Sequence, residues 1–354
     1  MKNFVLLTSS RCFLATCFVV VCSTTFADTI DRIVFGSCNH QDKPQPIWTP
    51  ILAEHPDLFI FLGDNVYADT TDPDKLRATY QRLADKPGFQ QLRATTNIVA
   101  TWDDHDYGKN DAGAELKGKA SSREIMLDFW NEPKDSPRRT QPGGIYTAYL
   151  LGEPGKIVQV ILLDTRWNRT PLVTVKDKEE LRQREQANMG PYEQSLAAGA
   201  TLLGQEQWAW LEQQLQVKAD LRIIGSSIQV LSDFTGWESW SNFPRDRLQL
   251  IELLTKYQHE PIVLISGDTH WAELSEIRDG DLEWPLIELT SSGLTQEWAN
   301  ISPNRHRLGK GFAKANYGVI DLDWTASPPA VSLSIKDSHN KVQIQQNVRY
   351  PNTN

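Results

Sequence analysis

A buried strand that ends in a glycine and an acidic residue constrains the fold of this chain more than any other feature. Leu58–Leu62 is a continuous apolar run, which is typical of a β-strand buried on both faces. The run ends at Gly63, and Asp64 and Tyr67 follow directly after it. Ligands of open α/β sheets bind at the carboxyl ends of the strands, so this turn predicts a functional site. Taken alone, the stretch also fits an aspartate that caps a turn and a tyrosine packed over it.

Three further apolar strands end in residues that can bind metal ions. These residues are Cys38 after Arg32–Gly36, Asp103 after residues 97–102, and Asp268 with His270 after Ile262–Ser266. Residues 45–55 fit a helix between the first two strands, so this βαβ unit predicts parallel strands whose tips share one rim. Turn chemistry explains one such ending, but it does not easily explain four at one rim.

An acidic cluster follows the strand at residues 97–102. Asp103, Asp104, Asp106 and Asp111 place four carboxylates around His105 within nine residues. Their mutual repulsion requires a cation to offset it. A solvated acidic loop is the alternative, but the histidine and the apolar strand before the cluster argue against it. We therefore interpret the cluster as functional.

The first 27 of the 354 residues have the pattern of an export signal. Lys2 and Arg11 give a positive start, residues 12–22 form an apolar core, and small residues precede a cleavage site after Ala27. This core is too short to span a bilayer, and we expect no transmembrane segment. The sequence therefore predicts an exported protein, either periplasmic or secreted. Its net charge of −9 and the lack of a Lys/Arg block argue against nucleic-acid binding.

Cys38 is the cysteine that would remain after removal of the signal, because the other three lie within residues 1–27. A single cysteine cannot form an internal disulfide bond. A lone thiol in an oxidising compartment has to be buried or bound to a ligand. An inert buried cysteine and a metal ligand are the two interpretations.

The rest of the chain predicts an α/β fold in which helices flank two packed mixed β-sheets within one domain, residues 28–354. Helices are expected at residues 73–85, 121–130 (capped by Ser121 or Ser122), 205–216 and 245–258. Apolar, alternating runs at residues 286–290, 317–322, 330–335 and 342–348 make the second half rich in strands. Residues 167–200 are polar and poorly periodic, which favours an insertion or a lid.

The types of ligand indicate which metal ions the site suits. Thiolate, phenolate and imidazole suit a trivalent or borderline metal such as iron, whereas carboxylates suit calcium, magnesium or manganese. Asp64 lies between the two groups in this interpretation and can bridge them. Two metal ions about 3.5–4 Å apart can bind a phosphoryl group and activate water as a nucleophile at neutral pH.

Six motifs in this order resemble a known family. Gly63-Asp64-Asn65-Val66-Tyr67 is similar to the Gly-Asp-x-x-Tyr motif of the calcineurin-like metallophosphoesterases in their purple-acid-phosphatase form. The others are Phe35-Gly36-Ser37-Cys38, Trp102-Asp103-Asp104-His105-Asp106, Leu163-Asp164-Thr165-Arg166, Gln207-Trp208-Ala209-Trp210-Leu211 and Ser266-Gly267-Asp268-Thr269-His270-Trp271. With them, the chain resembles the PhoD-like alkaline phosphatases from about residue 32 to residue 323. This resemblance implies the αββα sandwich of the metallophosphoesterases.

The resemblance also implies a role for each residue of these motifs. An iron ion, Fe³⁺, would be held by Cys38, Asp64, Tyr67 and His270. One or more calcium ions would be held by Asp64, Asp103 and Asp268, and manganese, magnesium or zinc could replace these metals. His105 would face the leaving group, Asp104 or Asp106 would orient it, and Asn110 and Arg166 would bind substrate oxygens.

We therefore expect an exported phosphomonoesterase or phosphodiesterase of the alkaline phosphatase D type. Its substrate would be a small-molecule, lipid or polymer phosphate ester, attacked by a metal-bound hydroxide while His105 acts as the general acid. The alternative is a non-catalytic, metal-stabilised exported protein whose Trp-rich loops bind a lipid or glycan. His105 separates the two hypotheses, because a structural metal site has no use for a free imidazole beside its aspartates.

Overall fold

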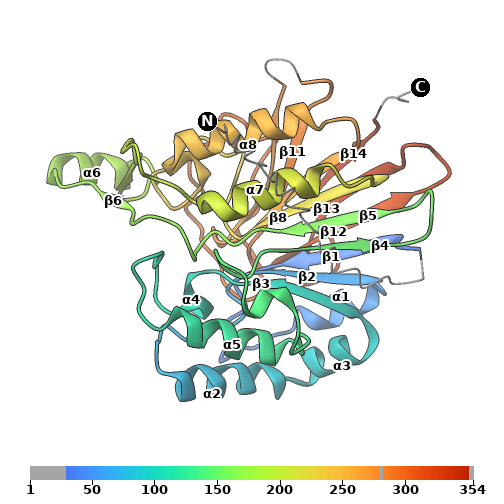
Figure 1. Ribbon diagram of the computed structural model, residues 1–354, viewed down its shortest axis with the longest axis horizontal. Helices are drawn as coiled ribbons and strands as arrows, with labels where there is room; N and C mark the ends of the chain where they lie inside the picture. Colours follow the sequence, from blue (N-terminus) through green and yellow to red (C-terminus); the bar gives the residue numbers. More distant parts are fainter. Residues whose placement is uncertain (1–28, 279–281, 351–354) are drawn as a thin grey trace, which may run out of the picture.

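The computed structural model describes residues 29–278 and 282–350, so the expected export signal lies outside the described residues. Two six-stranded sheets make up most of this part, and a two-stranded sheet lies apart from them (Figure 1). The first sheet has the order β14-β13-β12-β1-β2-β3, and the second has the order β10-β11-β9-β8-β5-β4. Each sheet contains parallel and antiparallel pairs, so both are mixed.

The strands have the following bounds: β1 Arg32–Gly36, β2 Leu58–Leu62, β3 Asn97–Thr101, β4 Thr147–Leu151, β5 Val158–Leu162, β6 Val173–Thr174, β7 Tyr192–Glu193, β8 Leu221–Ser226, β9 Ile262–Ser266, β10 Ala272–Ile277, β11 Leu286–Ser291, β12 Asn316–Asp323, β13 Ala330–Asp337 and β14 Val342–Val348. The helices are α1 Trp48–Ala53, α2 Pro73–Ala84, α3 Pro87–Thr95, α4 Asp104–Tyr107, α5 Lys119–Phe129, α6 Lys178–Gln186, α7 Gly204–Leu215 and α8 Pro244–Lys256, with 3₁₀ turns η1 Pro137–Arg139 and η2 Trp240–Asn242. None of the described helices has the length and apolar character needed to cross a bilayer.

The side chains of β2 explain why this strand is apolar at every position. Leu58, Ile60 and Leu62 pack between the two sheets, in a core cluster that also contains residues of β5, β8 and β9. Phe59 and Phe61 face the other way and pack against α1, α2, α3 and α5. A third cluster joins the outer face of the second sheet to α7 and α8. The layers are therefore helix, sheet, sheet and helix, which confirms the predicted fold class.

Several elements differ from the sequence prediction. The predicted cap of α5 is wrong: Gly118, in the left-handed region at φ 92°, precedes this helix, and Ser122 is buried within it. The helices α3 and α4 were not predicted. Strand β10 was also missed because its glutamates make it look like a surface segment, although Glu273 is buried and pairs with Arg307.

Residues 167–200 contain α6 and the short antiparallel pair β6–β7. This segment forms a lobe that projects from the body of the molecule at the left of Figure 1. Helix α6 has no buried residues, and Asp177 caps it by accepting hydrogen bonds from the amides of Glu179 and Glu180. The helix nevertheless contacts the body of the protein through Arg184, whose guanidinium lies 5.6 Å from the centroid of the Phe234 ring.

Candidate metal centre

The strand tips bring ligand-bearing residues from both sheets to one place. Strands β1, β2 and β3 are parallel neighbours in the first sheet, and Cys38, Asp64 and Asp103 follow their carboxyl ends. Asp268 and His270 follow β9, which belongs to the second sheet. The ligand-bearing strand ends of the two sheets therefore lie together at one end of the sandwich. The rim expected from the sequence is thus formed by both sheets.

The backbone at these tips is strained at four residues. Cys38, Asp64, Asp268 and His270 have φ angles of 62°, 50°, 73° and 61°, in the left-handed region that L-residues rarely adopt. Such strain clusters at functional sites, because the surrounding structure has to stabilise it. A glycine is required at position 63, because a Cβ atom there would lie 2.5 Å from Cβ of Asp103.

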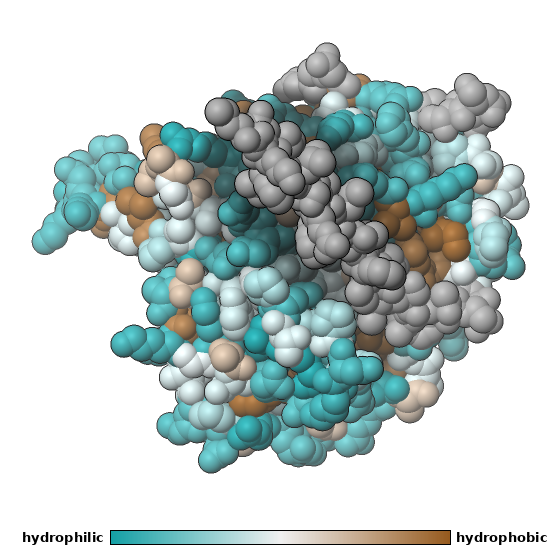
Figure 2. All heavy atoms as spheres, in the orientation of Figure 1, coloured by the Kyte–Doolittle hydropathy of each residue, from teal (hydrophilic) through white to brown (hydrophobic). Residues whose placement is uncertain are grey.

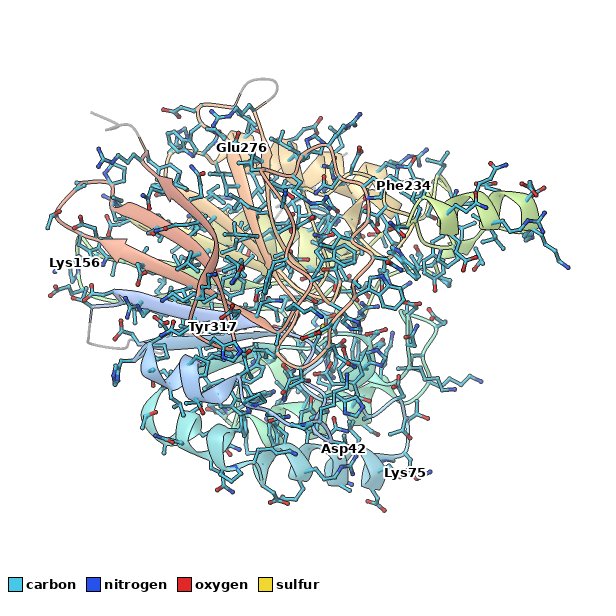
Figure 3. All side chains as sticks on the ribbon, turned by 180° about the vertical axis from the view of Figure 1, so that it is seen from behind. Asp42, Lys75, Lys156, Phe234, Glu276 and Tyr317 are labelled. Atoms are coloured by element: carbon cyan, nitrogen blue, oxygen red, sulfur yellow. The ribbon has the colours of Figure 1, made fainter. Side chains whose placement is uncertain are left out.

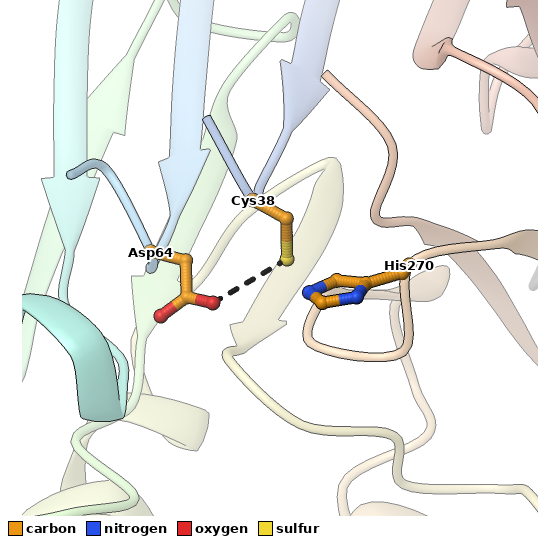
Figure 4. Close-up of side chains that lie close together, drawn as sticks. All are labelled: Cys38, Asp64 and His270. Carbon is orange, nitrogen blue, oxygen red and sulfur yellow. Dashed lines mark hydrogen bonds between the residues drawn. The ribbon is translucent and has the colours of Figure 1, made fainter. Parts of the chain in front are cut away.

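Cys38, Asp64 and His270 form the first ligand group. Their ligand atoms all lie within 4.8 Å of one another, and Sγ of Cys38 is 3.6 Å from Oδ2 of Asp64 (Figure 4). The hydroxyl of Tyr67 lies 2.9 Å from Nε2 of His270. The structure thus brings together the four residues that the resemblance assigns to the iron ion.

The electrostatics of this group fit a bound cation. Burial raises the pKa of the Cys38 thiol to about 12, so the thiolate needs a positive partner to form. Burial and the nearby His105 lower the pKa of His270 to about 4, which leaves its imidazole neutral and able to bind a metal.

The carboxylates form three overlapping groups beside the first. These groups are Asp64, Asp104 and His105; Asp103, Asp104 and Asp268; and Asp104, Asp111 and Glu238, each with ligand atoms within 4.8 Å. Asp64 thus belongs to two of the four groups and Asp104 to three. Both residues occupy positions from which a carboxylate can contact more than one ion.

Burial and like charges disfavour the ionised form of the carboxylates in this cluster, and a bound cation would favour it. Burial, and then the charge of Asp104, raises the pKa of Asp64 well above its usual range, and burial with Asp103 does the same for Asp268. Burial raises the pKa of Asp103 to about 8 although Arg166 opposes it. Oδ2 of Asp103 is buried and has no hydrogen-bond partner among the described residues. Hard cations prefer such oxygen ligands, so the residues present fit bound metal ions.

Arg166 stabilises the acidic cluster through ion pairs. Its side chain is fully buried and forms ion pairs with Asp103 at 2.5 Å and Glu238 at 2.6 Å. Burial alone would raise the pKa of Asp104, but Arg166 and then His105 hold it at about 2. The expected contact between Arg166 and substrate is therefore not supported, because its guanidinium is already occupied by carboxylates. Asn110, in contrast, is exposed and lines the cavity above the cluster.

His105 points toward the cavity and has an acidic partner that the sequence analysis missed. Its Nδ1 lies 2.8 Å from Oδ1 of Asp69, and its ring centroid lies 4.1 Å from that of Tyr67. Burial opposes the charged form, but Asp64 and Asp69 outweigh this effect and raise the pKa of His105 to about 10. Asp69 lies two residues after Tyr67 in the same turn, and this position could have indicated that Asp69 belongs to the site.

The prediction that Asp104 or Asp106 orients the imidazole of His105 is wrong. Asp106 accepts hydrogen bonds from the amide of Asp103 at 2.7 Å and from Asn65 at 2.5 Å, which stabilises the turn into α4. The carboxylate of Asp104 accepts from the amides of His105 and Asp111, and it belongs to the ligand groups. Neither carboxylate bonds to the ring.

Glu238 and Asp111 complete the site, and of the two only Asp111 belongs to the acidic cluster that the sequence revealed. Glu238 lies in the irregular segment between β8 and η2, and its neighbours do not reveal that Arg166 and Arg169 pair with it. The hydroxyl of Tyr192, from the lobe, donates to Asp111. A cavity of about 220 Å³ lies above these groups.

A sandwich of two mixed sheets with potential metal ligands at its strand ends fits a metal-dependent phosphoesterase. The chain belongs to the PhoD-like phosphatase family, whose model matches residues 33–346. The predicted family is thus confirmed, and the protein is a phosphatase of the hydrolase class. Among proteins with curated descriptions, none matches the sequence.

Two solved structures share the fold. The structure of PhoD aligns with a TM-score of 0.62 and 16% identity, over 92% of this chain and 73% of that chain. GAP50, described as the anchor in the inner membrane complex of Plasmodium, aligns with a TM-score of 0.57 and 13% identity, over 92% of this chain and 90% of that chain. At these identities the likeness shows the fold alone.

We expect Cys38→Ser to lower the metal content of the first ligand group and the phosphatase activity together. A serine hydroxyl is a much weaker ligand than a thiolate for iron-type ions. Loss of the thiolate should exceed the roughly 10–100-fold loss of affinity typical of changes around the ligands. Elemental analysis and turnover of the purified variant measure both effects. Full metal content with full turnover would make Cys38 an inert core residue.

Proposed function

We propose that this protein is an exported hydrolase of phosphate esters in which His105 protonates the leaving group. The observation that carries the proposal is the position of His105, which lies beside the carboxylates with its Nδ1 bonded to Asp69 and its ring facing the cavity. Export is inferred from the signal pattern at residues 1–27, which favours a periplasmic or secreted protein.

We assign the two kinds of ligand to two kinds of metal. Iron, as Fe³⁺, suits the group that contains the thiolate, the phenol and the imidazole, namely Cys38, Asp64, Tyr67 and His270. Calcium suits the carboxylates of Asp64, Asp103 and Asp268, to which the geometry adds Asp104. When bound, these ions supply positive charge to the phosphate oxygens and activate water at neutral pH.

Side chains of the protein would carry out proton donation and hold the reacting groups in position. Asp64 and Asp69 favour the charged form of His105 and raise its pKa, which suits a group that donates a proton to a departing alkoxide. Asp69 holds Nδ1, which leaves Nε2 as the nitrogen that can face the leaving group. Arg166 keeps the carboxylates of Asp103 and Glu238 in position through its two ion pairs.

The fold by itself does not establish catalysis, since GAP50 is described as an anchor. Turnover of p-nitrophenyl phosphate and bis-p-nitrophenyl phosphate, with and without added calcium or a chelator, tests the proposal. We expect metal-dependent hydrolysis of at least one substrate, and the pair distinguishes a monoesterase from a diesterase. An intact metal-loaded protein that hydrolyses neither ester would favour the non-catalytic binding protein.

We expect Asp69→Asn to slow the hydrolysis of alkyl phosphates by about 10–10²-fold, less than removal of His105 itself. The amide cannot stabilise the charged imidazole or fix its ring in the same way. Metal content should stay unchanged, and p-nitrophenyl phosphate should be affected less because its phenolate leaves without a proton. Asp74→Asn is the matched control, since the Asp74 side chain is 96% exposed on α2. Equal losses on both substrates would contradict a positioning role for Asp69.

A further inference from the structure

The cavity above the metal centre shares a wall with a second cavity. Trp237 and Trp298 line the first, of about 220 Å³, together with His105 and Asp268. The same two tryptophans line the second, of about 440 Å³. Their ring centroids are 6.0 Å apart in an edge-to-face arrangement. The two rings therefore form the boundary between the metal centre and a larger space beside it.

The loops of the metal centre fix both tryptophans in position. The amide of Trp298 donates a hydrogen bond of 3.0 Å to the carbonyl of His270. Trp237 directly precedes Glu238, which is held by its buried ion pair with Arg166. Trp298 is nevertheless 42% exposed. Such an aromatic surface at the edge of an active site is available to a ligand.

The lobe of residues 167–200 supplies the outer wall of the second cavity. Leu181, Met189 and Pro191 line it together with the polar Glu185 and Asn188. In Figure 2, hydrophobic atoms are visible at the base of this lobe. The wall therefore offers apolar surface beside two polar side chains.

The base of the lobe is fixed to the segment that carries Trp237. The amide of Gly190 donates to the carbonyl of Thr235, and a Cβ at Gly190 would lie 2.4 Å from the carbonyl oxygen of Gly236. The guanidinium of Arg184 lies 5.6 Å from the centroid of the Phe234 ring, which Figure 3 places at the junction of lobe and body. These contacts hold the lobe wall of the second cavity in a fixed position relative to Trp237.

We propose that this second cavity binds an apolar organic substituent of the phosphate ester, of the size of an aromatic ring system. The inference rests on the proposed function, because the phosphate would lie at the metal centre while the substituent passes Trp237 and Trp298. A volume of about 440 Å³ falls within the range typical of small-molecule pockets. Aromatic edges and aliphatic side chains favour an uncharged ring over a polar group. The protein would thus select esters with a bulky apolar group.

The test compares substrates that share a leaving group and differ only in apolar bulk. Ethyl phosphate and naphthylethyl phosphate both release a primary alkoxide, and their p-nitrophenyl diesters both release p-nitrophenolate. We expect metal-loaded wild-type protein to favour the naphthylethyl member by about tenfold or more in kcat/KM. Trp298→Ala should remove most of this preference, and Met189→Ala, from the lobe wall, should reduce it. Leu248→Ala is the control, since Leu248 is 57% exposed on α8 and should leave the preference unchanged.

The outcomes separate this inference from the proposed function. Turnover without a preference in the wild-type protein, or a preference retained in both Trp298→Ala and Met189→Ala, would overturn the assignment of the second cavity and leave the phosphatase reaction intact. Hydrolysis of no ester at all by the metal-loaded protein would overturn the proposed function, and the substrate assignment with it.

Discussion

We expect His105→Ala to slow the hydrolysis of alkyl phosphates by about 10²–10⁴-fold while metal content stays near that of the wild-type protein. An alkoxide is a poor leaving group, and a proton from His105 would offset its developing negative charge. The Asp69 carboxylate, 2.8 Å from Nδ1, orients the ring for this transfer. p-Nitrophenyl phosphate should be slowed much less, because its phenolate leaves without protonation. Steady-state rates on both substrates, with elemental analysis of the same sample, measure the effect.

The alternative role for His105 is that of a metal ligand. It belongs to one of the four ligand groups, with Asp64 and Asp104, so the geometry allows this. A ligand would lose metal on substitution and would slow both substrates equally, and this result would contradict the general-acid role. His339→Ala is the matched control, since His339 is exposed between β13 and β14 and should change neither rate nor metal content.

The second large effect concerns Asp64, which we expect to hold both kinds of metal ion. Asp64 shares one ligand group with Cys38 and His270 and another with Asp104 and His105. Asp64→Asn should therefore lower the content of both metals and abolish most activity, because a neutral amide cannot balance the charge of two cations. Asparagine tolerates the left-handed backbone at φ 50°, so the fold of the turn should be retained.

Asp103→Asn is the comparison for Asp64→Asn. Asp103 belongs only to the group with Asp104 and Asp268, so its replacement should reduce the calcium-type content and spare the iron-type content. Elemental analysis of the two variants, prepared side by side, gives the ratio of the metals in each. Equal retention of both metals in the two variants would contradict a bridging role for Asp64.

Local sequence patterns were sufficient to predict the core strands and most of the candidate metal ligands. Leu58–Leu62 is apolar throughout because it packs between sheets on one face and against helices on the other, and this double burial is visible in the residues themselves. A glycine directly after such a strand, followed by an aspartate, marks a strand tip in any fold of this class. Cys38 and Asp103 were found because each follows an apolar strand, and Asp268 was found by the repeated Gly-Asp pair.

Only the tertiary structure decided how distant segments meet at these tips. Glu238 follows no apolar strand, and its charge becomes part of the site through the buried Arg166, for which the family resemblance implied a contact with substrate. Likewise, β9 delivers Asp268 from the second sheet, and the lobe brings Tyr192 to Asp111. The physical reason is that a local pattern reports the burial and periodicity of one segment. The partner of a buried charge depends on how sheets and loops pack, and residues far apart in the chain determine that packing.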